Sequence, residues 1–210
     1  MENIFSTSIS ILALAVSSLT AWLTLLRKGT VLMTQPTVIY FGPDGGTKAM
    51  EPPEKIFLRT LLYSTGKRGH IIENMFVRLR RGETQQNFNI WAYGDKDLYR
   101  GSGLFVPETG LATNHHFLLP PDGTTFQFSV GRYLLDVFVT EVGSSSPARI
   151  CSVSLEITRE IFENFNQPGH GLYFDWGPDA GRYFAHVRPP PQTELPAFFQ
   201  EMFAKRDRPG

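Results

Sequence analysis

Histidines, aspartates and one cysteine are the residues of this chain that could carry out chemistry, and their spacing limits that chemistry. His115 and His116 are adjacent, so on a strand their side chains would point to opposite faces. Only a loop would let both bind one metal, and we expect one packed and one solvated histidine instead. His170 and His186 with Asp175 or Asp179 would make a metal set of two imidazoles and a carboxylate. Their spacing matches no known motif, and the aspartates of this region suit turns.

Other signatures of catalysis are also missing from the sequence. Gly101-Ser102-Gly103 lacks the G-x-S-x-G pattern of a nucleophile elbow. Cys151 is the only cysteine, so no intramolecular disulfide can form, and it lies on the inward face of an expected strand, where a thiol is usually inert. We find no phosphate loop, dinucleotide fingerprint or zinc spacing. The sequence therefore predicts no cofactor, no metal and no catalytic residue.

Composition places a further limit on function. Lys plus Arg and Asp plus Glu both number 20, so the formal net charge is zero. Nucleic-acid-binding domains usually show a basic excess. We therefore expect no nucleic-acid partner.

The elements that would position any site begin with an uncharged run from Ile4 to Leu26. As a helix it would span about 35 Å, enough to cross a hydrocarbon core of about 30 Å. Residues 1–29 are therefore predicted to be a transmembrane signal-anchor helix, because Glu2 and the absence of an A-x-A-like site do not suit a cleaved signal peptide. Arg27 and Lys28 follow the run, and positive charge is retained on the cytoplasmic side. We expect a single-pass protein of the cell inner membrane with its C-terminal domain in the cytoplasm.

The span also carries a stripe of small residues. Residues four and three apart in alternation keep to one side of a helix, and small stripes let helices approach closely in lipid. Such a stripe would allow a helix-mediated homo-oligomer, although a span rich in Leu and Ser also contains stripes by chance. The stripe consists of Ser6, Ser10, Ala13, Ser17, Thr20 and Thr24.

The body of the chain shows short apolar alternations separated by turn signals, which is typical of a β-sandwich. We predict an antiparallel immunoglobulin-like β-sandwich of about eight strands over residues 36–158, because few helices lie between the strands and parallel strands need crossovers of a dozen residues or more. The strand at Lys55–Thr65 is apolar on both faces and should be central. The remaining strands are expected at 37–41, 70–80, 87–93, 104–106, 111–119, 124–130, 132–142 and 149–158.

Beyond Arg159 the pattern changes. An aromatic hairpin extension is predicted over residues 159–188, with strands at 171–176 and 182–187. Residues 189–210 would then form a proline spacer and a short amphipathic helix. The apolar stripe of that helix is the predicted partner-binding segment, and it comprises Leu195, Phe198, Phe199, Met202 and Phe203.

Aromatic residues suggest a second kind of site. Trp91 and Tyr93 alternate on one strand, and Tyr173 and Trp176 lie in the hairpin. Together these four residues could bind a carbohydrate or another small ligand, although packing in a core is the commoner use of such side chains.

The stretch from Leu62 to Asn74, with its Ser-Thr-Gly-Lys-Arg-Gly turn between two strands, resembles bacterial single-span membrane proteins that have an immunoglobulin-like domain. The position of Arg27-Lys28-Gly29 just before the first strand is similar too. The resemblance covers the anchor and the domain up to Thr158. It implies a fold and a tether, and it implies no catalytic or binding residue.

These observations favour a membrane-tethered, non-enzymatic protein-interaction module with an unknown protein partner. A carbohydrate-binding or small-ligand-binding β-sandwich is the alternative, and a metal-dependent hydrolase is the least favoured hypothesis.

Overall fold

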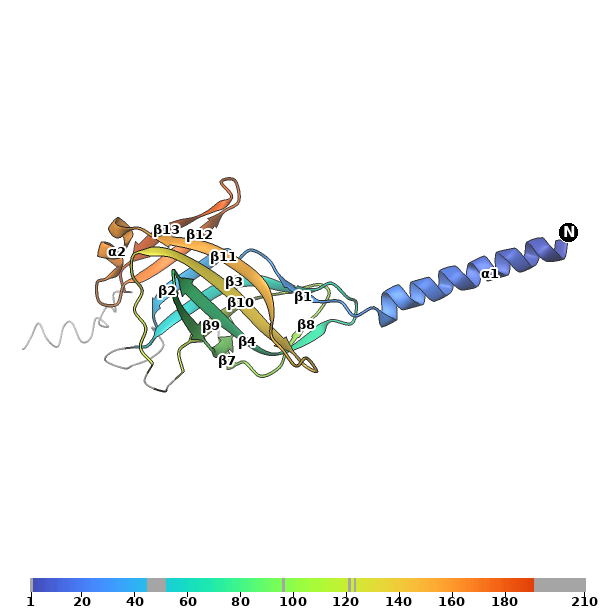
Figure 1. Cartoon of the computed structure of the whole chain (residues 1–210), viewed down its shortest axis with the longest axis horizontal. Helices are drawn as coiled ribbons and strands as arrows, with labels where there is room; N and C mark the ends of the chain where they lie inside the picture. The colour runs from blue at the N-terminus through green and yellow to red at the C-terminus, as the bar shows by residue number, and fades with distance from the viewer. Residues whose placement is uncertain (1, 45–51, 96, 121, 123, 191–210) are drawn as a thin grey trace, which may run out of the picture.

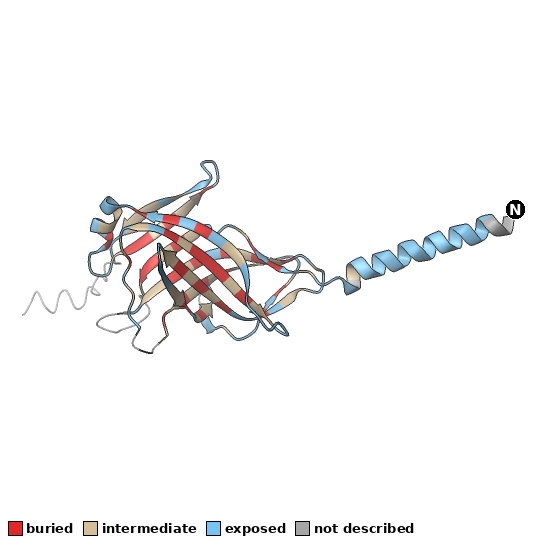
Figure 2. Cartoon of the chain, in the orientation of Figure 1, coloured by how far each residue is buried: buried red, intermediate tan, exposed pale blue. Residues whose placement is uncertain are grey.

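The N-terminal helix stands apart from the rest of the molecule (Figure 1). The computed structural model describes residues 2–44, 52–95, 97–120, 122 and 124–190. In it, α1 (Glu2–Ala21) continues into the π-helical segment η1 (Trp22–Leu26). The stretch Phe5–Thr24 is long and apolar enough to cross a membrane, as a span or a signal sequence would be. It is exposed along its length (Figure 2).

Three hydroxyl groups on this helical segment are hydrogen-bonded within it. Ser10, Thr20 and Thr24 donate to carbonyl oxygens one turn earlier, at 3.0, 2.8 and 2.7 Å. A hydroxyl bonded in this way costs little in lipid, since it needs no partner from water.

Two antiparallel sheets form the body, which confirms the predicted mainly β fold. Sheet A contains β1 (Val31–Met33), β2 (Val38–Pro43), β3 (Glu54–Ser64), β6 (Ile90–Tyr93), β7 (Tyr99–Arg100), β9 (Leu111–Leu118), β12 (Gly171–Gly177) and β13 (Arg182–Arg188). Sheet B contains β4 (His70–Arg81), β5 (Thr84–Phe88), β8 (Leu104–Val106), β10 (Gly131–Glu141) and β11 (Ala148–Ile157). The short helix α2 (Arg159–Phe165) follows β11.

Sheet A runs in the order β13-β12-β2-β3-β9-β6-β7, with β1 also paired to β3, and sheet B runs β11-β10-β4-β5, with β8 paired to β4. The strand at β3 is central, as predicted, because β2 and β9 pair with its two edges. The immunoglobulin-like arrangement of strands stays a prediction.

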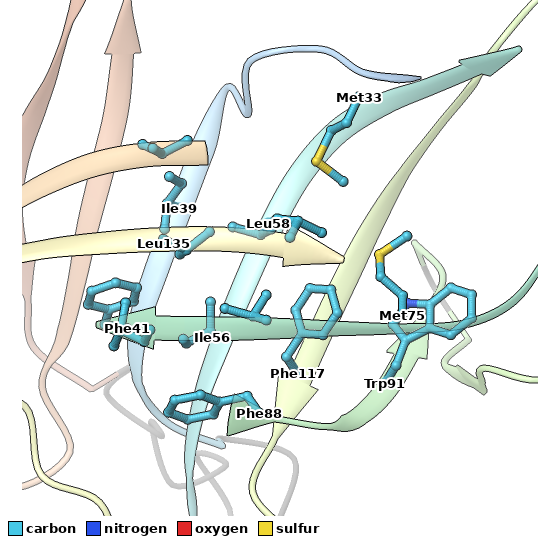
Figure 3. Packing of buried hydrophobic residues seen from close by; sticks show 14 of the residues in the cluster. Met33, Ile39, Phe41, Ile56, Leu58, Met75, Phe88, Trp91, Phe117 and Leu135 are labelled. Carbon is cyan, nitrogen blue, oxygen red and sulfur yellow. The ribbon is translucent and has the colours of Figure 1, made fainter. Parts of the chain in front are cut away.

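The core lies between the two sheets (Figure 3). Alternate residues of β3, such as Ile56 and Leu58, point inward and are fully buried, as Leu135 and Val137 of β10 are from the opposite sheet. Burial of a side chain of this size stabilises the fold by about 1.5–3 kcal/mol. Because the period of a strand is two, each intervening residue of β3 is directed to the outer face of sheet A.

One expected strand, 87–93, is divided between the sheets. β5 pairs with β4 in sheet B, whereas β6 pairs with β9 in sheet A, and Asn89 lies at the crossing point. The break changes which residues face inward, so Phe88 and Trp91 are both buried although their spacing is odd. One unbroken strand over 87–93 would have placed Trp91 and Phe88 on opposite faces, and this part of the prediction was wrong.

A second local correction concerns β4. A period of two over the predicted strand 70–80 would place Ile71 on the inward face with Met75, but Ile72 is buried and Ile71 is 48% exposed. The pairing of β4 with β10 shifts between Thr140 and Glu141, which is the mark of a β-bulge. The bulge shifts the inward-facing positions at the start of β4 by one residue.

The strand predicted over residues 124–130 does not form in the described part of that segment. Phe126 and Phe128 still point inward, and Phe128 stacks on Phe41 with ring centroids 4.7 Å apart. The backbone of Ser129 bonds to a side chain instead of a strand: its N–H donates to the Tyr133 hydroxyl and its carbonyl accepts from it, both at 2.8 Å. Alternation of apolar residues here reflects core filling without strand pairing.

The aromatic hairpin is β12–β13, and it lies within the sandwich. β12 pairs with β2, and Leu172 and Phe174 of β12 are buried in the core. α2 begins at its N-cap Thr158, whose hydroxyl accepts the Ile161 N–H at 3.3 Å.

Candidate binding surface

The structure does not bring the four predicted ligand-binding residues together. Trp91 is 2% exposed and lies in the core, where its Nε1–H donates to Nδ1 of His115 at 3.2 Å. Tyr93 is half-buried beside it, with ring centroids 5.1 Å apart. Figure 3 shows Trp91 among core side chains such as Met75.

Tyr173 and Trp176 lie on opposite faces of β12, because three positions separate them. Trp176 packs against Tyr183 of β13 at 5.1 Å, on the side of the core. Tyr173 points to the outer face of sheet A. A flat platform of these four aromatic residues is therefore not formed.

The histidine pair is divided as expected. His115 is buried, and burial lowers its pKa to about 3, with a smaller contribution from His116. His116 lies on the outer face of sheet A, where burial and the nearby Lys55 lower its pKa to about 4. Both imidazoles are neutral near pH 7. In the described residues no three His, Cys, Asp or Glu side chains gather closely enough to hold a metal ion.

A different set of rings does come together, on the outer face of sheet A. Neighbouring strands contribute one residue each, and each residue is the register partner of the next. The set crosses β13, β12, β2, β3 and β9 in a single line, and all of its members are partly exposed. We call it the aromatic row, and it consists of His186, Tyr173, Tyr40, Phe57 and His116.

Ring contacts hold the aromatic row in place. His186 stacks on Tyr173 at 5.5 Å, and Tyr173 meets Tyr40 edge-on at 4.9 Å. Phe57 meets His116 edge-on at 5.0 Å. Such aromatic pairs contribute about 0.5–1.5 kcal/mol each beyond their buried area. The Tyr40 hydroxyl donates to the Pro43 carbonyl at 2.9 Å, and burial raises the pKa of Tyr40.

At the β13 end of the aromatic row, His186 lies between two charged groups. Arg188 Nε donates to His186 Nε2 at 3.0 Å, and His186 Nδ1 lies 3.4 Å from Asp175 Oδ2. This arrangement suits a neutral imidazole that accepts at Nε2 and carries its proton on Nδ1. The Arg188 guanidinium also lies over the Tyr173 ring, 4.8 Å from its centroid.

Permanent cations surround the aromatic row. Lys55 lies 5.8 Å from the centroid of Tyr40 and forms an ion pair with Asp44 at 2.8 Å. The strand register directs further arginines to the same face, because their cross-strand partners face outward too. The cations of this face are Lys55, Arg59, Arg100, Arg182 and Arg188.

A cavity of about 580 Å³ lies at the end of the sandwich away from α1. Phe128, Phe162 and Phe165 line it, together with Glu54. Burial raises the pKa of the Glu54 carboxyl to about 7, and its Oε2 has no partner among the described residues. The cavity could admit a small apolar ligand.

Sequence analysis found only part of the aromatic row. Tyr173 was named as a ligand residue, and His116 and His186 were weighed as metal ligands. The other members went unnoticed, because the row joins residues more than a hundred positions apart. The sequence held one signal of the row. β3 is apolar on both faces, so Phe57 had to lie on the face that points away from the core. The predicted partner-binding residues Leu195, Phe198, Phe199, Met202 and Phe203 lie outside the described residues.

Comparison with known proteins adds little. No protein-family model matches the chain, and no curated protein matches it. A crystal structure of Spo0M, a sporulation control protein from Bacillus subtilis, aligns over 84% of this chain and 71% of that one, with 12% sequence identity and a TM-score of 0.31. A similarity at this level does not define a common fold.

Proposed function

We propose that this protein is a membrane-tethered, non-enzymatic interaction module that binds a protein partner through the aromatic row. The observation that carries the proposal is the outer face of sheet A. The solvated face of an antiparallel sheet is normally polar, yet here it presents a line of rings flanked by cations. Aromatic residues and arginine are the types most enriched in the centres of protein interfaces.

Ring orientation favours a protein over a sugar. A sugar ring stacks on a flat aromatic surface, but the planes of Tyr40 and Tyr173 are inclined by 61° and those of Phe57 and His116 by 62°. Ridges of this kind fit between the side chains of another protein. Rings and permanent cations bind a partner, whereas a reaction would need a paired nucleophile and base.

Charge specifies the chemistry of the partner. Among the described residues, the five cations of this face outnumber its carboxylates Asp44 and Asp175, which already lie against Lys55 and His186. A second copy of the chain, docked through the same face, would bring cations against cations. We infer a partner with an acidic surface that includes exposed apolar side chains.

The tether belongs to the same proposal. α1 would span a bacterial inner membrane, and Arg27 and Lys28 would keep the sandwich in the cytoplasm. The stripe of small residues on α1 would allow helix-mediated dimers, which would present two aromatic rows together.

Site-specific photo-crosslinking in intact cells would test the binding face. A benzophenone side chain at Phe57 probes the aromatic row, and one at Phe138 on the outer face of sheet B is the matched control, because Phe138 is also a half-buried aromatic residue. We expect a discrete adduct at Phe57 that is absent at Phe138. Arg59→Glu should abolish that adduct, because it reverses charge on an exposed residue beside Phe57. Equal adducts at both positions, or an adduct insensitive to Arg59→Glu, would overturn the proposal.

A further inference from the structure

The junction between α1 and the sandwich is short and fixed. Gly29 packs directly on Gly66, so closely that a Cβ on Gly29 would lie 2.2 Å from the Gly66 nitrogen. The Thr30 N–H donates to the Thr65 hydroxyl at 2.8 Å, and the Thr65 N–H donates to the Thr30 carbonyl at 3.0 Å. These contacts attach the end of the helical segment to the β3–β4 turn. Only Arg27 and Lys28 lie between these attached residues and the end of η1.

This junction fixes the distance from the sandwich to the bilayer. Leu26, the end of η1, and Gly29 are three Cα–Cα steps apart, and consecutive Cα atoms are about 3.8 Å apart, so the reach is at most about 11 Å. The headgroup zone on each side of the hydrocarbon core is about 5–8 Å thick. With α1 in a membrane, the β3–β4 turn must lie within or just above the headgroups.

Exposed apolar side chains gather at the same end. Ile71 and Phe105 are register partners on β4 and β8, and the Val142 N–H donates to the Ile71 carbonyl at 2.9 Å. The three side chains are 48%, 53% and 62% exposed. The Phe105 ring lies over Gly69, where a Cβ would approach it to 2.7 Å. Side chains of this kind are unfavourable in water and suit the boundary between headgroups and acyl chains.

Beside these side chains lies a cleft of about 620 Å³, which we call the proximal cleft. Lys28 from the junction and Arg68 from the β3–β4 turn both line it. The carboxylate in its lining is Glu141, and His70 forms an ion pair with it. Glu73 and Glu108, at the same end of the molecule, are not part of the lining. The two cations are thus available to an anion.

We propose that the proximal cleft binds the headgroup of an anionic phospholipid. Lys28 and Arg68 contact the phosphate, while Ile71, Phe105 and Val142 enter the boundary with the acyl chains. The proposal rests on the membrane tether of the proposed function and is independent of the aromatic row. Its consequence is that the sandwich is held at the bilayer at two places, through α1 and through the cleft.

Fluorescence quenching in nanodiscs would test this proposal with the full-length chain. Val142 and Val130 lie just beyond the two ends of β10 and are both exposed, so they form a matched pair for labelling. Each is replaced by Cys in a Cys151→Ala background, labelled with a fluorophore, and placed in discs that contain headgroup-spin-labelled lipid. We expect strong quenching from position 142 in discs with phosphatidylglycerol, weaker quenching in discs of phosphatidylcholine alone, and little from position 130 in either.

Charge reversal separates headgroup binding from mere proximity. Arg68→Glu should lower the retention of phosphatidylglycerol, measured by native mass spectrometry of the purified protein, by about five-fold or more. Arg132→Glu, at the opposite end of the molecule and 82% exposed in its side chain, is the control and should leave retention unchanged. Position-142 quenching that is equal in both lipids and insensitive to Arg68→Glu would overturn the proposal. Failure of the tether would show differently, because the chain would be extracted from membranes by alkaline carbonate.

Discussion

Acid should destabilise this protein through a single buried histidine. His115 lies in the core, its Nδ1 accepts the Trp91 N–H, and its Nε2 is buried with no partner in the described part of the chain. A protonated imidazole at this position would need a hydrogen-bond acceptor at each ring nitrogen, and burial would remove the water that solvates its charge. Burial therefore lowers its pKa to about 3, from an ordinary value of 6.5.

The sign and size of the effect follow from proton linkage. Between pH 6.5 and pH 3 the unfolded chain binds a proton at His115 that the folded chain does not bind, so the free energy of unfolding falls as the pH falls. For a shift of this size, the part due to His115 falls by about 1.5 kcal/mol between pH 6.5 and pH 5.0.

Urea unfolding of the full chain in mild detergent, followed at both pH values, measures this change. His115→Asn removes the titrating group and keeps an acceptor near the position of Nδ1, so the wild type should lose about 1.5 kcal/mol more than the variant between the two pH values. All other titrating groups are common to both proteins and cancel in the comparison. If the two proteins show the same pH dependence, His115 is not a buried neutral histidine.

Further predictions concern three other sites. The pH dependence of stability due to Glu54 has the opposite sign. Its raised pKa of about 7 gives stability that is present below pH 4.5 and is lost as the pH rises through 7. Glu54→Gln should therefore raise the thermal midpoint more at pH 8 than at pH 5, and an equal change at both would count against burial of the carboxyl. Gly66→Val should loosen the junction, since its Cβ would lie 2.8 Å from the Gly29 nitrogen, and faster proteolysis at residues 27–30 would report it. Cys151 should react slowly with thiol reagents in the folded state, because burial raises its pKa to about 11, and labelling as fast as in urea would refute its placement.

Much of the fold follows from the period of the sequence. β3, β10 and β11 are long, and their inward residues repeat every second position over a full strand, as those of β4 do from Met75 onward, so the existence of these strands could be predicted. The hairpin β12–β13 could be predicted because the turn residues Gly177-Pro178-Asp179 separate two aromatic-rich segments. These elements follow from the strand period and the turn residues of their own segments.

The errors arose where tertiary contacts override local pattern. At residues 126 and 128, alternating phenylalanines fill the core from a segment whose backbone is held by the Tyr133 hydroxyl. At Asn89 one strand passes between sheets, which buried Trp91 and removed it from the predicted ligand site. The aromatic row could not be predicted, because its register depends on pairings among β13, β12, β2, β3 and β9.

The distance between the aromatic row and the helix junction has a consequence for the choice of partner. Phe57 and Gly66 are nine residues apart along nearly one strand, and a strand rises about 3.3 Å per residue, so the row lies about 30 Å from the junction measured along β3. If α1 spans a membrane as proposed, the chain would present the proposed binding face at a set height over the lipid. Proteins embedded flush with the bilayer would then be too low to reach it. The height of the proposed binding face would thus select partners by how far they extend from the membrane.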